Sequence, residues 1–118
     1  MRSWLIYLKE RFPLPVYILL SGGLAVYGSV LVGREVQSVA TAYAFTYAML
    51  LFATLGLMDE LKDYDKDLLA HPTRPLPRGV LKVGVVAKVI HWSMAIGILL
   101  SIGFFVFDSA AAVLALVT

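Results

Sequence analysis

The sequence has no cysteine, little charge and no extended basic stripe. Without cysteine the chain can form neither disulfides nor thiolate metal sites. Charged residues make up only 15% of the 118 residues, and the formal net charge is +2. Nucleic-acid-binding proteins cluster Lys and Arg on one face without matching acids, and no such stretch occurs here. These absences exclude a disulfide framework and a thiolate metal centre, and they argue against a nucleic-acid partner.

Apolar residues are instead in excess, and they occur in long runs with at most one charged residue. Hydrophobic types make up 60% of the chain, whereas a soluble domain has about 45 to 50%. A helix needs about 20 residues to cross the hydrocarbon core of a bilayer. Three runs qualify, at residues 14–33, 36–58 and 83–107. They predict an all-α, polytopic transmembrane helix bundle, with residues 1–118 as part of a single membrane domain.

The two ends of this pattern leave alternatives. Basic residues precede the first run, as in a signal peptide, but the run is longer than the about 7 to 15 residues of a signal-peptide core. We therefore expect a retained span. After Asp108 and Ser109, residues 110–118 are uncharged and would reach only about 13 Å as a helix. We expect three complete spans plus a truncated fourth, and a re-entrant or interfacial tail is the alternative.

The basic residues predict the orientation in the membrane. They lie before the first span and in the loop at residues 59–82, and the other short loop offers only Arg34. The residues concerned are Arg2, Lys9, Arg11, Lys62, Lys66, Arg74, Arg78 and Lys82. Because positive loops stay on the cytoplasmic side, we expect an inner-membrane protein whose N-terminus and 59–82 loop are both cytoplasmic.

Acidic residues recur at helical spacing just after the second run. If the helix continues, Asp59, Glu60, Asp63 and Asp67 share one face. Like charges this close favour a bound cation, and oxygen ligands alone favour a hard ion such as Mg²⁺, which substrate phosphates help to hold. Asp65 falls off the face. The alternative is a solvated acidic and basic cap on a helix end, with pairs such as Lys62 with Lys66 and Asp63 with Asp67 on separate stripes of the helix.

A proline-rich loop follows the acids. The stretch 71–79 reads His-Pro-Thr-Arg-Pro-Leu-Pro-Arg-Gly, and its prolines end the helix and fix several φ angles. The loop therefore holds Arg74 and Arg78 near the acidic face, where their guanidinium groups suit phosphate oxygens. Alternatively, these two cations only follow the positive-inside rule.

Together the two stretches resemble the first aspartate-rich motif of the UbiA prenyltransferase superfamily, NDxxDxxxD followed by HPxRPLPxG. Asp59 stands where the pattern usually has Asn, and Glu60 where it has Asp, while Asp63, Asp67 and Arg74 match. The resemblance implies that Asp59, Glu60, Asp63 and Asp67 hold Mg²⁺ against a prenyl diphosphate. It also implies catalytic roles for Asp63, Asp67 and Arg74 and a phosphate contact for Arg74, and Arg78 would bind the same substrate.

The resemblance further implies transfer of the isoprenyl group to a lipophilic or aromatic acceptor. The family has nine helices and a second aspartate-rich motif, and neither is present in these residues. The isolated chain is therefore expected to be inactive, with a second chain or a longer protein supplying the other half. The rival interpretation is a non-catalytic membrane fragment or subunit that retains the motif. A CDP-alcohol phosphotransferase is disfavoured because its DGxxAR signature is missing.

Two polar residues lie early in the third run. Lys88 either snorkels to the membrane interface or reaches the diphosphate. His91 fits a hydrogen-bonded interior histidine better than a ligand.

Overall fold

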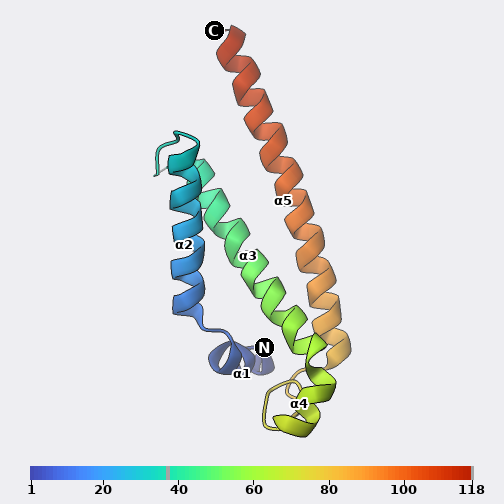
Figure 1. Ribbon diagram of the computed structural model, residues 1–118. Helices are drawn as coiled ribbons and strands as arrows, with labels where there is room; N and C mark the ends of the chain where they lie inside the picture. The colour runs from blue at the N-terminus through green and yellow to red at the C-terminus, as the bar shows by residue number, and fades with distance from the viewer. Residues whose placement is uncertain (37, 118) are drawn as a thin grey trace.

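The fold is described from a computed structural model covering residues 1–36 and 38–117, in which the side chains of residues 111–113 and 115 are left undescribed. The described residues form five helices, shown in Figure 1: α1 (Arg2–Arg11), α2 (Leu14–Leu31), α3 (Val39–Lys62), α4 (Tyr64–Ala70) and α5 (Val83–Val117). No strand occurs among them. The all-α prediction is confirmed.

Three of these helices are long and apolar enough to cross a membrane: α2, α3 and the Val83–Ala110 part of α5. They run up, down and up, and α3 packs against both α2 and α5. These features indicate an integral membrane protein. The second span begins at Val39, later than residue 36, because the Ser38 hydroxyl accepts a hydrogen bond from the Thr41 amide and caps the helix.

The third span is longer than expected. We expected a boundary at Asp108 and Ser109, but α5 continues through both residues, so the described part of 110–118 extends the same helix. Neither residue is a strong helix breaker, and the Ser109 hydroxyl donates to the Phe105 carbonyl at 2.7 Å inside the helix. Figure 1 shows the last turns of α5 extending beyond α2 and α3.

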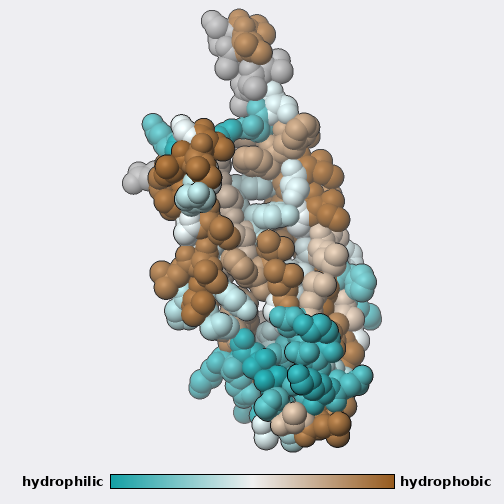
Figure 2. Space-filling model, in the orientation of Figure 1, coloured by the Kyte–Doolittle hydropathy of each residue, from teal (hydrophilic) through white to brown (hydrophobic). Residues whose placement is uncertain are grey.

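The best-packed part of the molecule lies at one end of the bundle and not along the spans. Its buried apolar side chains come from α1, the end of α3, the 71–82 loop and the start of α5: Tyr7, Leu57, Leu76, Leu81, Val86 and Ile90. Side chains along the spans are mostly exposed, with Trp92 at 71% and Phe105 at 73%. Figure 2 shows the polar residues gathered at one end below a largely hydrophobic surface. An exposed surface of this kind suits lipid or further helices.

At the opposite end of the bundle, individual polar contacts connect α5 to α3 and to the turn after α2. Arg34, after α2, pairs with Asp108 of α5. The Tyr43 hydroxyl of α3 donates to the Leu100 carbonyl of α5. The turn after α2 uses Gly33 at φ +69°, a conformation that favours glycine. Because Arg34 follows the end of α2 and α1 precedes its start, Asp108 lies toward the end of the bundle opposite α1.

This arrangement makes the predicted orientation testable. We expect Arg2→Cys and Arg78→Cys to be protected from an impermeant thiol reagent in intact cells, and Asp108→Cys to be labelled, because basic loops stay inside. The chain has no cysteine of its own, so labelling reports only the introduced site. Labelling of Arg78→Cys from outside intact cells would reverse the orientation.

Candidate functional site

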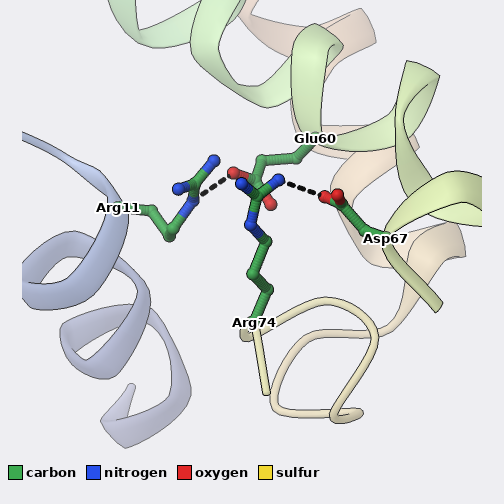
Figure 3. Close-up of polar contacts among 4 residues, drawn as sticks. All are labelled: Arg11, Glu60, Asp67 and Arg74. Atoms are coloured by element: carbon green, nitrogen blue, oxygen red, sulfur yellow. Dashed lines mark hydrogen bonds and ion pairs between the residues drawn. The ribbon is translucent and has the colours of Figure 1, made fainter. Parts of the chain in front are cut away.

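The helix that carries the acids breaks at Asp63. α3 ends at Lys62 and α4 begins at Tyr64, with Asp63 between them at φ −89° and ψ 2°. The expected single helical face therefore does not form. The break redirects the chain, so Glu60 projects from α3 and Asp67 from α4 (Figure 3).

Glu60 is buried and paired with a residue of α1. It is 6% exposed, and its Oε1 accepts a hydrogen bond of 2.5 Å from Nε of Arg11. Its other oxygen, Oε2, is buried and has no hydrogen-bond partner among the described residues. Burying an unsatisfied carboxylate oxygen is unfavourable. Glu60 therefore offers one free ligand atom for a donor or a cation.

Asp67 forms the second buried ion pair. It is 3% exposed, and its Oδ2 accepts a hydrogen bond of 2.6 Å from Nη1 of Arg74. Figure 3 shows that Arg11 extends from α1 and Arg74 from the 71–82 loop, and that both side chains point toward the carboxylates of Glu60 and Asp67. The pairing of an acid in the motif with Arg74 agrees with the expected placement of the loop beside the acids.

The remaining acids are more exposed. Asp59 is 72% exposed as a side chain and pairs with Lys62 at 3.1 Å. Asp63 is half-buried, and Asp65 is exposed. No group of three or more His, Asp or Glu side chains in the described part of the chain lies close enough together to hold a metal ion. The structure thus brings Glu60 and Asp67 into an arginine-lined site but does not assemble all four acids.

The 71–82 loop is ordered by its own packing and hydrogen bonds. Pro75 and Leu76 are buried. Gly79 adopts φ +79°, and the Val80 amide donates to the Pro75 carbonyl at 2.9 Å. These contacts order the backbone that carries Arg74 and Arg78. Arg78 donates to the Thr73 carbonyl at 3.0 Å.

Helix α1 covers the site, and the sequence reasoning did not anticipate this. Arg78 bonds Oε1 of Glu10 at 3.1 Å, and Arg11 holds Glu60. Tyr7 is 4% exposed, and burial, followed by the nearby Glu60 carboxylate, raises its pKa to about 12. The available signals were the Lys-Glu-Arg sequence just before the first span and the aromatic pair Trp4 and Tyr7 one helical turn apart.

A glycine lets α2 and α1 approach α3 closely. A Cβ on Gly56 would lie 3.3 Å from the Tyr17 hydroxyl and 3.9 Å from the Tyr7 hydroxyl. Tyr17 also stacks on Phe52 of α3, with ring centroids 5.8 Å apart. The hydroxyl groups of Tyr17 and Tyr7 therefore reach α3 one turn before Glu60.

Lys88 and His91, near the start of α5, both lie on its exposed surface. His91 is exposed, with Nδ1 2.7 Å from the Ala87 carbonyl of its own helix. It is hydrogen-bonded as expected, but it is not an interior residue of this chain. Lys88 is exposed and has no ion pair among the residues that the structure describes. A role for Lys88 at the diphosphate stays a prediction.

Comparison of the chain with protein-family models, with curated proteins and with solved structures finds no match.

Proposed function

We propose that the chain is the N-terminal part of a UbiA-type prenyltransferase and carries the first of its two diphosphate-binding half-sites. The observation that carries this proposal is the pair of buried carboxylates, Glu60 and Asp67, each of which is paired with an arginine. Glu60 lies in the last turn of the apolar helix α3, and Asp67 lies in the short helix α4 that follows it. The motif resemblance supplies the substrate class, an isoprenyl diphosphate. The acceptor would be an aromatic or lipophilic molecule.

The donor set fits Mg²⁺ in its chemistry. All ligand atoms on offer are carboxylate oxygens, which Mg²⁺ prefers in combination with substrate phosphates. The unpartnered Glu60 Oε2 is one such atom, and Asp67 would supply another. Asp59 and Asp63 belong to no group of three acids in the described part of the chain that is close enough to share the ion, so substrate phosphates would complete its coordination. When bound, Mg²⁺ would supply positive charge to the leaving diphosphate.

The other groups in the site would act on the substrate directly. Arg74 and Arg78 present guanidinium groups, which match phosphate oxygens and would orient the diphosphate. A cavity of about 170 Å³ lies further along α3 against α5, lined mainly by apolar groups that include Leu51, Met94 and Ile98. It would take part of the isoprenyl chain. The second aspartate-rich motif and the acceptor contacts would come from residues outside this chain or from a second chain.

A non-catalytic role is the second candidate, and one observation favours it. Arg11 and Arg74 already neutralise Glu60 and Asp67 without any metal ion. Such pairs could serve only to fix the loop and the helices in an assembly. In that case the site would have no need of Mg²⁺ or diphosphate.

Calorimetric titration of the purified chain in detergent micelles separates the two candidates. We expect an isoprenyl diphosphate such as geranyl diphosphate to bind in the presence of Mg²⁺ and to lose this binding in excess chelator, since the carboxylates and the diphosphate repel each other without the cation. We expect no turnover, because half of the site is missing. Absence of Mg²⁺-dependent binding would favour the non-catalytic role, and turnover by the chain alone would show that the second motif is dispensable or is supplied by a homodimer.

A further inference from the structure

Two ion pairs and one buried aromatic side chain hold helix α1 over the candidate site. The Arg11–Glu60 pair at 2.5 Å and the Arg78–Glu10 pair at 3.1 Å tie its last turn to α3 and to the loop. Tyr7, one turn earlier, is buried in the apolar cluster at this end of the bundle. Figure 3 shows that Arg11 reaches Glu60 from α1, while Arg74 comes from the loop.

The charges of the site balance without a metal ion. Two carboxylates, on Glu60 and Asp67, face two guanidinium groups, on Arg11 and Arg74. A divalent cation bound at Glu60 Oε2 would share one carboxylate with Arg11, which already occupies Oε1. Two positive groups on one buried carboxylate repel each other, and solvent ions screen buried groups poorly. A cation at Oε2 and Arg11 at Oε1 would therefore each be held less tightly than either one alone.

We propose that a divalent cation and Arg11 compete for Glu60, so that α1 is a detachable cover that is released when the cation binds. This inference rests on the proposed function, in which Glu60 is a metal ligand. Release would leave α1 tethered, because only Phe12 and Pro13 separate it from α2. The cation would then supply the positive charge at Glu60 that Arg11 gives up, and the diphosphate would help to hold the cation, which links release of α1 to arrival of the substrate.

The chain offers a reporter for the position of α1. It has two tryptophans: Trp4, which packs against the apolar cluster beside Tyr7, and Trp92, which lies exposed on α5. In a Trp92→Phe background, quenching of Trp4 by acrylamide measures how far α1 is undocked. We expect MgCl₂ with inorganic pyrophosphate to raise the quenching constant at least about twofold, as in local opening of a covered segment. NaCl of equal ionic strength should leave the constant unchanged.

Substitutions then assign the effect to Arg11. Arg11→Gln should give the high quenching constant without any cation and show little further response, and Glu60→Gln should behave in the same way. Arg2→Gln removes an equal charge from the same helix, at an exposed residue that forms no ion pair within the described part of the chain, and should match the parent protein. Arg11→Lys keeps the charge and should stay close to the parent protein. Equal quenching in Arg11→Gln and its parent would show that Arg11 does not hold α1.

A covalent tether provides an independent test. The double variant Glu10→Cys with Arg78→Cys is compared with itself before and after its two cysteines are joined by a short bismaleimide, because Arg78 is itself a candidate phosphate contact. Cross-linking should abolish the response of Trp4 to Mg²⁺ and pyrophosphate and weaken their calorimetric binding relative to the same variant without the cross-linker. Binding of unchanged affinity in the tethered protein, or binding in the untethered protein without a change in Trp4 quenching, would overturn the detachable cover and leave the proposed function intact. Absence of calorimetric binding in the parent protein would overturn the proposed function itself, and this inference with it.

Discussion

Asp67→Asn is expected to weaken Mg²⁺-dependent binding of geranyl diphosphate at least about tenfold, or about 1.4 kcal/mol. The substitution keeps the shape of the side chain but removes the charge that a cation would share. Asp67 is 3% exposed, so little solvent is available to replace the lost interaction. Isothermal titration of the purified chain with and without Mg²⁺ measures the effect.

Neighbouring acids provide matched controls for this experiment. Asp65→Asn removes the same charge two residues away. Because Asp65 is exposed, this substitution should weaken Mg²⁺-dependent binding much less. The motif predicts a loss at Asp63 as large as that at Asp67, whereas burial predicts a smaller loss at the half-buried Asp63. Equal effects at all three positions would contradict the diphosphate site and favour a solvated acidic helix end.

Arg74→Ala is expected to have the largest effect on stability. It leaves the Asp67 carboxylate buried without its 2.6 Å partner, and breaking a buried ion pair in this way costs about 3 to 5 kcal/mol. Because the carboxylate anchors the loop, we expect amide hydrogen exchange in residues 71–82 to accelerate first. Thermal unfolding in detergent, followed by circular dichroism, gives the global effect.

Two further variants separate the ion pair from other causes. Combining Arg74→Met with Asp67→Leu removes both charges and should recover most of the lost stability, since apolar groups often replace a buried pair at little cost. Arg78→Ala breaks a more exposed pair with Glu10 and should cost about 1 kcal/mol or less. If Arg74→Ala proves as mild as Arg78→Ala, Asp67 is not held by Arg74 in solution.

The spans were predictable because hydrophobicity and length alone determine them. The first span begins at Leu14 and the third at Val83, as the apolar runs predict. The boundary at Asp108 was misplaced because a change of charge was taken as the end of a helix, although nothing there disrupts backbone hydrogen bonding. Local chemistry at Ser38 could have corrected the start of α3, since serine is a favoured N-cap residue.

The candidate site was only partly predictable. Arg74 was expected near the acids because the proline-rich loop is short, and its pair with Asp67 spans seven residues. The partner of Glu60 could not be predicted from the sequence, because Arg11 lies 49 residues earlier and no local pattern links the two residues. The break at Asp63 was also missed. Helical spacing assumes a continuous helix, and the packing that redirects α4 depends on residues distant in sequence.

The docking of α1 has a consequence for how the protein is made. During synthesis, Arg11 cannot form its ion pair until Glu60 has been made. Glu10 cannot form its pair until Arg78, which is 68 residues further along the chain, has been made. At about 5 to 20 residues per second of synthesis, α1 emerges seconds before the surfaces that bury Tyr7 exist. During that interval its aromatic face has no protein partner, and the bilayer surface beside the first span is the nearest apolar environment. Assembly of this end of the molecule is therefore a late step, completed only after the start of α5 has been synthesised.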